Sequence, residues 1–439
     1  MAQLTLADHP HRFSLANELH ARPSPELNAP LSAVHLAIKP AENAADRDRS
    51  LDLAHLIALL DRYGAAHPAP GASHYSGPLG RGFLKWEMHT EFVTYTIFAD
   101  QVSEVPFSGA VFSMFPADWL AAAPGTVVTS CLVRVESCGP AALEPRLAGD
   151  VLQWFVPESL AISRVVDGEA VVAADFHIDE NGHSRMAVFA VPGIGARRLG
   201  RIVQRLLEIE TYKSMAMLTL PVARSVTGAV ARLDTGLSDL VADMARGRGD
   251  DAETLDRLLK VSAEIEHLSA SSAFRFGASG AYEAIVTQRV AVLREERIGG
   301  RQIFAEFMTR RFDPAMRTCR SANQRLQELS GRAERAANLL RTRVDVENQA
   351  QNTQVLHEMA KRAAMQLRLQ ETVEGLSVVA ISYYAVTLGT YLLGPLAEPF
   401  GIEKSHLSAL LVIPVVLGVW FMVRRIRARL GHGDGAAEH

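Results

Sequence analysis

The chain ends in two long apolar runs, and these runs restrict its fold more than any other feature of the sequence. The first, residues 375–397, contains no side chain that is charged at neutral pH and is long enough to cross a hydrocarbon layer about 30 Å thick. The second, residues 407–423, is at the short limit and contains Pro414, which a neighbouring helix can accommodate. We therefore expect residues 371–439 to form a hairpin of two transmembrane helices. Two buried helices of a soluble domain are the alternative.

Basic residues flank the two runs on one side. Lys361, Arg362 and Arg368 precede the first run, and Arg424, Arg425, Arg427 and Arg429 follow the second. The short connection between the runs offers only Lys404 against Glu398 and Glu403. Because cytoplasmic loops carry the excess of Lys and Arg, we expect the C-terminus and residues 1 to about 370 to lie in the cytosol.

The first run carries hydroxyl groups along one face. At 100° per residue, an arc of the helix surface contains Ser377, Tyr384, Thr387 and Tyr391, and aliphatic side chains occupy most of the remainder. Hydroxyl-bearing and small residues on one face of a membrane helix usually mark packing against another helix. A hydrated pore lined by several copies of this face is the alternative.

Residues 196–370 show helical periodicity and are expected to form a long, coiled-coil-like stalk. A first helix is predicted from about residue 197 to 245, interrupted or bent at Pro221. A second is predicted from about residue 250 to 297, where Gly299 and Gly300 would end it.

The last part of this helical region leads directly into the first apolar run. Small and apolar residues recur at spacings of three and four from Cys319 to Leu340, and no proline occurs between Pro314 and Pro395. We therefore expect one unbroken helix from about residue 315 into the membrane. A helical hairpin packed on its neighbours is the alternative.

Residues 1–195 are predicted to form an α+β domain. Helices are expected near residues 13–21 and 44–63, and strands at 33–38, 82–90, 91–99 and 125–135, with a hairpin over 169–191. The Asn181-Gly182 pair is the strongest turn signal in this half, because both residues tolerate the positive φ of a tight hairpin turn.

No known catalytic motif occurs in the sequence, and the candidate ligand-binding residues are histidines with charged neighbours. They are His9, Arg12, Glu18, His20, Arg22, His89 and Glu91. Histidine and carboxylate side chains are metal ligands, and the arginines suit a phosphate or carboxylate. No pair has a distinctive metal spacing, so structural hydrogen bonding is the alternative. The metal is left unknown, and no cofactor is expected.

The charge balance and the cysteines exclude other classes of protein. A net charge of −4, from 45 basic and 49 acidic residues, does not suit a nucleic-acid-binding protein, which needs excess basic charge. The three cysteines, Cys131, Cys138 and Cys319, include no CxxC pair and fit no common zinc spacing. Reduced, mostly buried thiols are expected.

Several sequence blocks resemble a bacterial membrane-anchored family known as domain of unknown function 3422. They are HPHRFSLANELHARP (9–23), WEMHTEFVTYTIF (86–98), RLLEIETYKSMAM (205–217), FRFGASGAYEAIV (274–286), REERIGGRQIFAEFMTRRFDPAMRTC (294–319) and ETVEGLSVVAISYY (371–384). The resemblance covers nearly the whole chain and implies a place in the bacterial inner membrane. It implies no activity, catalytic residue or substrate.

The predicted architecture is also similar to that of the CorA-type magnesium channels, in which a cytosolic domain is joined by a long helix to two C-terminal spans. Those channels carry Gly-Met-Asn at the end of the first span. The corresponding stretch here is LGTYLLGP, residues 388–395, and it lacks that motif. The similarity is one of shape, which is a weak guide to function.

The sequence thus favours a non-enzymatic membrane protein whose cytosolic domain binds a ligand or a partner. Its expected partners are the lipid bilayer, further copies of itself and a small ligand or ion of unknown identity. A CorA-like channel is the second hypothesis. A membrane-tethered enzyme that uses His9, His11, His20 and Arg12 is the third.

Overall fold

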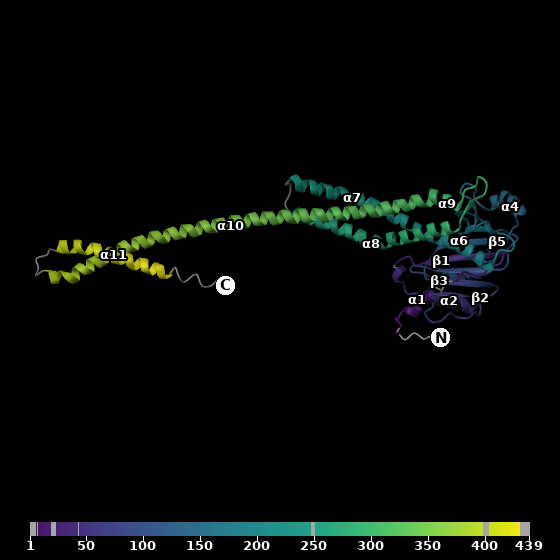
Figure 1. Ribbon diagram of the computed structural model, residues 1–439, viewed down its shortest axis with the longest axis horizontal. Helices are drawn as coiled ribbons and strands as arrows, with labels where there is room; N and C mark the ends of the chain where they lie inside the picture. The colour runs from purple at the N-terminus through teal and green to yellow at the C-terminus, as the bar shows by residue number, and fades with distance from the viewer. Residues whose placement is uncertain are drawn as a thin grey trace. The chain divides into compact units, whose positions relative to one another are not determined.

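The computed structural model describes residues 6, 8–18, 23–42, 44–246, 251–397 and 404–430. The chain divides into two compact units, Met1–Ala337 and Asn338–His439. The first unit is an α+β domain with a large sheet and long helices, and the second is helical (Figure 1).

One nine-stranded sheet organises the first unit. Its strands lie in the order β2-β3-β4-β1-β5-β8-β7-β6-β9, and every neighbouring pair is antiparallel except β5 with β8. The strands are β1 (Leu31–Lys39), β2 (His74–Leu79), β3 (Gly82–Met88), β4 (Val93–Ala99), β5 (Thr126–Ser137), β6 (Ala161–Val165), β7 (Ala170–Ile178), β8 (Ser184–Ala190) and β9 (Glu296–Arg297).

The predicted strands are present, and three further strands were not predicted. The pairing of β3 with β4 and the β7–β8 hairpin are confirmed, and Gly182 in its turn has a φ of +86°. The unpredicted β2 contains Pro78 and lies at the edge of the sheet, where a missing N–H costs no ladder hydrogen bond.

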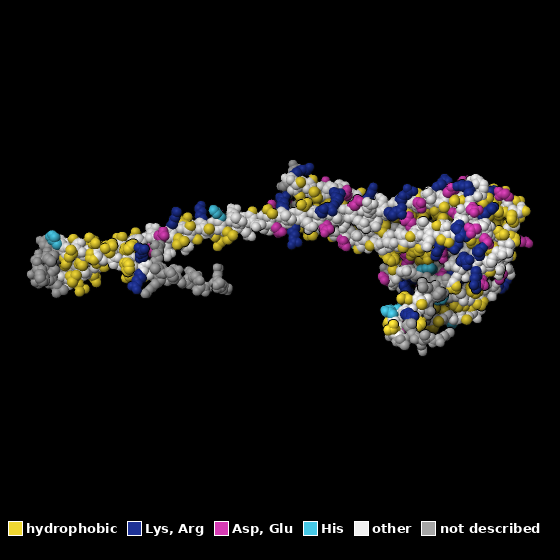
Figure 2. Space-filling view, viewed as in Figure 1, with side chains coloured by type: hydrophobic (Ala, Val, Ile, Leu, Met, Phe, Trp, Pro, Cys, Tyr) yellow, Lys and Arg dark blue, Asp and Glu magenta, His cyan; other side chains and the backbone are white. Residues whose placement is uncertain are grey.

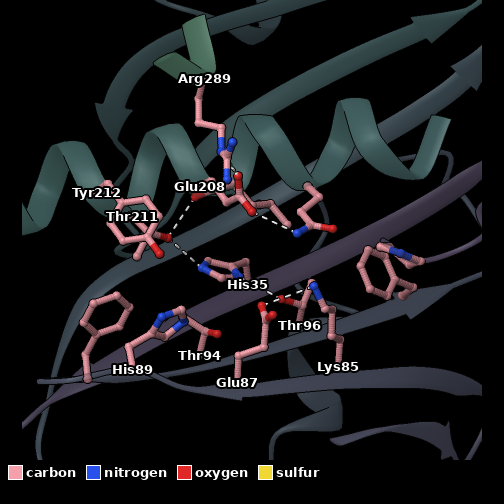
Figure 3. A pocket seen from close by; sticks show the side chains of 15 residues that line it. His35, Lys85, Glu87, His89, Thr94, Thr96, Glu208, Thr211, Tyr212 and Arg289 are labelled. Atoms are coloured by element: carbon pink, nitrogen blue, oxygen red, sulfur yellow. Dashed lines mark hydrogen bonds and ion pairs between the residues drawn. The ribbon is translucent and has the colours of Figure 1, made fainter. Parts of the chain in front are cut away.

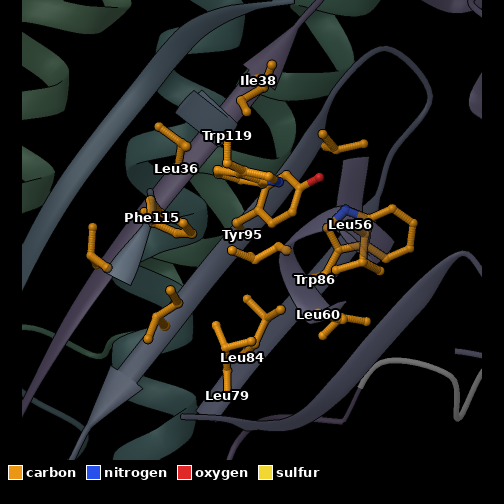
Figure 4. Packing of buried hydrophobic residues seen from close by; sticks show 14 of the residues in the cluster. Leu36, Ile38, Leu56, Leu60, Leu79, Leu84, Trp86, Tyr95, Phe115 and Trp119 are labelled. Carbon is orange, nitrogen blue, oxygen red and sulfur yellow. The ribbon is translucent and has the colours of Figure 1, made fainter. Parts of the chain in front are cut away.

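One face of the sheet carries the main hydrophobic core. Side chains alternate along each strand, so Leu84 and Trp86 of β3 point to the same face as Tyr95 of β4. Helix α2 (Arg49–Arg62) covers this face with Leu56 and Leu60, and α3 (Ala117–Ala121) adds Trp119. Figure 4 shows this cluster, whose labelled side chains converge between the strands and α2.

The same face is covered further along by a short helical segment. This segment comprises α4 (Pro140–Arg146), a π-helical turn (Leu147–Val151) and α5 (Leu152–Trp154). Its Leu147 and Val151 pack with Val171 of β7 and Phe189 of β8.

The opposite face of the sheet is covered by α6 (Ala196–Met217). Met215 of α6 packs against Ala37 of β1, and the side chain of Thr211 reaches His35. Both strand residues lie on the face away from α2, since Leu36 and Ile38 point to α2. The first unit therefore has helices on both faces of the sheet.

Three long helices follow, with ends that differ from the predicted ones. The first predicted helix is divided into α6 and α7 (Thr219–Arg246), and the break falls at Leu218. Pro221 lies in the first turn of α7, where its missing N–H is tolerated. Helix α8 is Asp251–Val292, so the prediction that Gly299 and Gly300 end it was wrong. The chain turns earlier because residues 296–297 pair with β6.

The structure has a single helix, α10 (Asp313–Ala397), where an unbroken helix was predicted. It follows α9 (Phe304–Phe307) and a π-helical turn. Within the first unit, ion pairs join Arg320 of α10 to Glu283 of α8 and Arg332 of α10 to Asp234 of α7. The predicted domain boundary after residue 195 lies inside the first unit, because α6 packs on the sheet.

Among the residues that the structure describes, the second unit contains the rest of α10 and α11 (Lys404–Leu430). Three helical stretches of the described chain are long and apolar enough to cross a membrane: Ala196–Arg246, Phe304–Leu393 and Ser405–Ile426. In the first, 39% of the most apolar window is buried inside the protein, against 6% in the other two. The first stretch is therefore explained by packing in the first unit, whereas the other two leave their apolar side chains exposed.

Candidate functional site

A polar cavity of about 230 Å³ lies between the sheet and α6. Its floor consists of the side chains of β1, β3 and β4 that point away from the hydrophobic core, including His35, Lys85 and Thr96. Its roof consists of α6, with Glu208 and Thr211, and Arg289 of α8 extends past α6 to Glu208 (Figure 3).

His35 is fixed at the centre of this cavity by two threonines from different elements. Its Nδ1 lies 2.8 Å from the hydroxyl of Thr96 on β4, and its Nε2 lies 2.8 Å from the hydroxyl of Thr211 on α6 (Figure 3). The Thr211 hydroxyl donates its own hydrogen to the carbonyl of Leu207, so it accepts a hydrogen bond from Nε2–H of His35. In the neutral ring, Nδ1 then accepts from Thr96.

The surroundings of His35 hold it in the neutral form. Burial, and secondarily the nearby positive charge of Lys85, lower the pKa of His35 from 6.5 to about 3. At neutral pH the ring therefore carries no charge, and a general base that must take up a proton near pH 7 would need a higher pKa. His35 is a positioning group that connects the sheet to α6.

Lys85 places a buried ammonium group beside His35. The residue is only 5% exposed, and its Nζ lies 3.2 Å from a carboxylate oxygen of Glu87 on the same strand. Among the described residues, Glu87 is the only partner found for this group. An ammonium has three N–H donors, so Lys85 keeps donors available to a molecule in the cavity.

A second pair of opposite charges faces Lys85 and Glu87 from the helices. Glu208 of α6 forms an ion pair with Arg289 of α8 and accepts a hydrogen bond from the Gln204 amide at 2.8 Å. The Gln204 carbonyl oxygen is buried and, within the described part of the chain, has no hydrogen-bond partner. A buried acceptor of this kind costs free energy unless another molecule donates to it.

Two further cavities adjoin the first. A cavity of about 460 Å³ shares His89, Phe92 and Tyr212 with it, and the ring of His89 stacks on Phe92 at 4.3 Å. The other, of about 620 Å³, shares Pro25 and Lys85 with it. Lys85 therefore lines both this cavity and the first one.

Gly200 allows the chain at Pro25 to close one end of the polar cavity. A Cβ atom at Gly200 would overlap the carbonyl oxygen of Pro25, so a larger residue does not fit without a shift of the backbone. The missing side chain thus lets the segment that precedes β1 lie directly on α6.

The N-terminal candidate residues are not joined to this cavity by any contact described for them. Arg12, on α1 (Arg12–Glu18), pairs with Asp8, and Nδ1 of His9 accepts from the backbone N–H of His11 at 3.2 Å. Glu18 is the last residue of α1. The candidates His20 and Arg22 lie outside the described residues.

Of the predicted residues, His89 reaches the cavity, whereas Glu91 is enclosed in a buried network next to it. Arg275 of α8 donates to the two carboxylate oxygens of Glu91 at 2.8 and 2.9 Å, and the Tyr282 hydroxyl donates at 2.7 Å. Lys39 lies 3.9 Å away. Glu91 is fully buried, so it ties the β3–β4 connection to α8 and is not open to a ligand.

The described residues contain no group of three or more His, Cys, Asp or Glu side chains arranged for a metal ion. The three cysteines are free thiols, and Cys131 and Cys319 are buried.

Sequence reasoning missed most of the cavity, including His35, Lys85, Thr96, Glu208 and Arg289. One signal was present, because the residues of β3 and β4 that alternate with the core, Lys85, Glu87, Thr94 and Thr96, are polar. A polar face suggests contact with solvent. Only the structure shows that α6 covers it.

The hydroxyl-bearing face of α10 makes hydrogen bonds within its own helix. Ser377 donates to the carbonyl of Val373, and Thr387 donates to that of Tyr383, each at 2.8 Å. Tyr384 and Tyr391 are 68% and 79% exposed. These four side chains therefore lie on the surface of the helix, and they are not arranged around a common ligand position.

Fold and cavity together define an α+β protein with a polar cavity between its sheet and a helix, and with apolar C-terminal helices. The chain matches the family model described as a protein of unknown function, DUF3422, over residues 7–430, and it belongs to this family. The resemblance found in the sequence blocks is confirmed. A comparison with curated proteins gives no match.

Proposed function

We propose that this protein is anchored in a lipid bilayer by α10 and α11 and that its first unit binds a small polar ligand in the cavity beneath α6. The observation that carries the anchoring is the exposure of large apolar side chains along both helices. Leu388 and Leu392 of α10 are 64% and 71% exposed, and Leu410 of α11 is 75% exposed. Figure 2 shows hydrophobic side chains gathered over these parts of the chain.

The proposed arrangement of the two spans is a hairpin. Its support is the close approach of the helices, since a Cβ at Gly389 of α10 would lie 3.5 Å from a methyl group of Leu411 on α11. Small residues allow such packing in membranes. The basic residues before the first span and after the second favour an orientation with both ends in the bacterial cytoplasm.

The proposal includes a helical stalk and association with further copies of the chain. Between the first unit and the apolar run, α10 exposes Leu356, Met359 and Leu367 by more than 60% each. A helix in water gains most of its stability from packing an apolar face. We expect this stretch to pair with the same stretch of a second copy.

The ligand-binding part rests on the cavity itself. It lies between the sheet and α6, where a sheet face would otherwise meet water, and it holds the buried ammonium of Lys85 and the unpartnered carbonyl of Gln204. Pockets with a few convergent polar groups are the usual binding sites of small molecules. No observation on the described residues favours the channel or the enzyme over this function.

Alkaline carbonate washing of membranes from cells that express the protein tests the anchoring. The full chain should remain with the membranes, and a variant that lacks residues 371–439 should be released while Trp86 and Trp119 keep the emission of buried tryptophans. Release of the full chain by carbonate would overturn the proposed anchoring.

A further inference from the structure

We infer that the cavity beneath α6 takes a small zwitterion with a carboxylate and an ammonium group, the class to which free amino acids belong. This inference rests on the proposed function, because it names the ligand class of the same site. The volume of about 230 Å³ equals that of roughly eight water molecules at ~30 Å³ each, which suits a ligand of this size.

The charges that face the cavity sum to zero before any ligand enters. Lys85 and Arg289 are positive, and Glu87 and Glu208 are negative. His35 is neutral, because burial lowers its pKa to about 3. A ligand with a net charge would leave that charge uncompensated in a partly desolvated site, which is costly. A zwitterion adds no net charge.

The hydrogen-bonding groups of the cavity that lack a partner among the described residues suit both the carboxylate and the ammonium group of a zwitterion. Lys85 keeps N–H donors beyond its contact with Glu87, and these suit a carboxylate. The buried Gln204 carbonyl needs a donor, which an ammonium supplies. Lys85 lies on β3 in the floor and Gln204 on α6 in the roof, so the two residues line the cavity from opposite sides.

The sheet and α6 are already held in position for this molecule. The two hydrogen bonds of His35, each 2.8 Å long, join β4 to α6 through one ring. A site that is formed before the ligand arrives loses less free energy to ordering on binding.

Isothermal titration of the full chain in mild detergent tests this inference with a matched set of probes. The zwitterions are glycine, L-alanine, L-leucine and L-glutamine. Propionate and ethylamine represent alanine without its ammonium and without its carboxylate. Inorganic phosphate is the probe for a plain anion. At least one zwitterion should bind saturably, and each singly charged probe should bind about tenfold more weakly or worse.

Two variants locate the binding. Lys85→Met removes the ammonium but keeps the length of the side chain, and Gln204→Leu removes the unpartnered carbonyl. Each should weaken zwitterion binding by about tenfold or more. The control Lys260→Met removes an exposed lysine that pairs with Asp256 on α8, and it should bind as the wild type does. If Lys85→Met does not fold, Gln204→Leu alone tests whether the ligand binds in this cavity.

The outcomes separate the inference from the proposed function. If propionate or phosphate binds as tightly as every zwitterion, and Lys85→Met loses this binding, the ligand class is wrong. The cavity then remains a ligand-binding site. If both variants bind a zwitterion as tightly as the wild type does, the assignment of the binding site to this cavity is overturned. If no probe binds to the folded protein, both the inference and the ligand-binding part of the proposed function are overturned, whereas the anchoring is judged by carbonate washing.

Discussion

Lowering the pH from about 7.5 to about 5 is expected to destabilise the first unit, and His35 should account for a defined part of that loss. The ring is buried between Thr96 and Thr211, and its pKa is lowered from 6.5 to about 3 in the folded protein. The unfolded chain therefore binds a proton at this residue before the folded chain does. The stabilisation by the neutral ring is complete above pH 6.5 and is lost as the pH falls toward 3.

The size of the effect follows from the two pKa values. The pKa of His35 is 6.5 in the unfolded chain and about 3 in the folded protein. Lowering the pH from about 7.5 to about 5 therefore decreases the free energy of unfolding by about 2 kcal/mol through this residue. Burial also lowers the pKa of His55 and of His183, so the wild type should lose more than this in total.

Urea denaturation of the full chain in detergent, followed by tryptophan fluorescence, measures this loss at the two pH values. Trp86 and Trp119 are fully buried in the core of the first unit and report its unfolding. In His35→Gln, the loss on acidification should be smaller by about 2 kcal/mol than in the wild type. The control His177→Gln, at an exposed histidine, should keep the wild-type loss. Equal losses in His35→Gln and the wild type would refute the reasoning.

Three other substitutions or treatments test the packing. Glu91→Gln removes the charge of the buried Glu91 that pairs with the partly buried Arg275, and it should lower the free energy of unfolding by about 3–5 kcal/mol in urea titration. A loss below about 1 kcal/mol would contradict the importance of this pair. Gly200→Ala should lower the melting temperature of the first unit, because the new methyl group collides with Pro25; an unchanged value would contradict the close approach. Cys131 is fully buried, and burial raises the pKa of its thiol. Mass spectrometry should therefore find Cys131 unmodified by iodoacetamide at about pH 8 until urea is added. Rapid labelling of Cys131 in the folded protein would count against that burial.

The local elements of the first unit were largely predictable from sequence. Period-two alternation predicted the β3–β4 pair, and Asn181-Gly182 predicted the turn between β7 and β8. The short strands β6 and β9 were not predictable in this way, because β9 has two residues and exists only through its pairing with β6. The same pairing explains why α8 ends before the glycines that were expected to end it.

The cavity was much less predictable than the elements that form it. His35 and Thr211 are 176 residues apart in the chain, and no local pattern relates them. Alternation shows that Lys85 and Thr96 share a polar face, but it cannot show which helix covers that face. His89 was singled out for its residue type, and it does line the cavity. Glu91 was singled out for the same reason and proved to be enclosed by Arg275 and Tyr282.

The placement of single cysteines along α10 and α11 in liposomes tests the membrane anchoring most directly. In a chain whose three native cysteines are replaced by alanine, a new cysteine is introduced at Gln351, Leu392 or Leu417 and treated with a maleimide that cannot cross the bilayer. All three positions are exposed on their helices. We expect Gln351→Cys to be labelled on outward-facing molecules, and Leu392→Cys and Leu417→Cys to be labelled only after detergent is added. Labelling of all three at the same rate in intact liposomes would contradict the anchoring of this protein by α10 and α11.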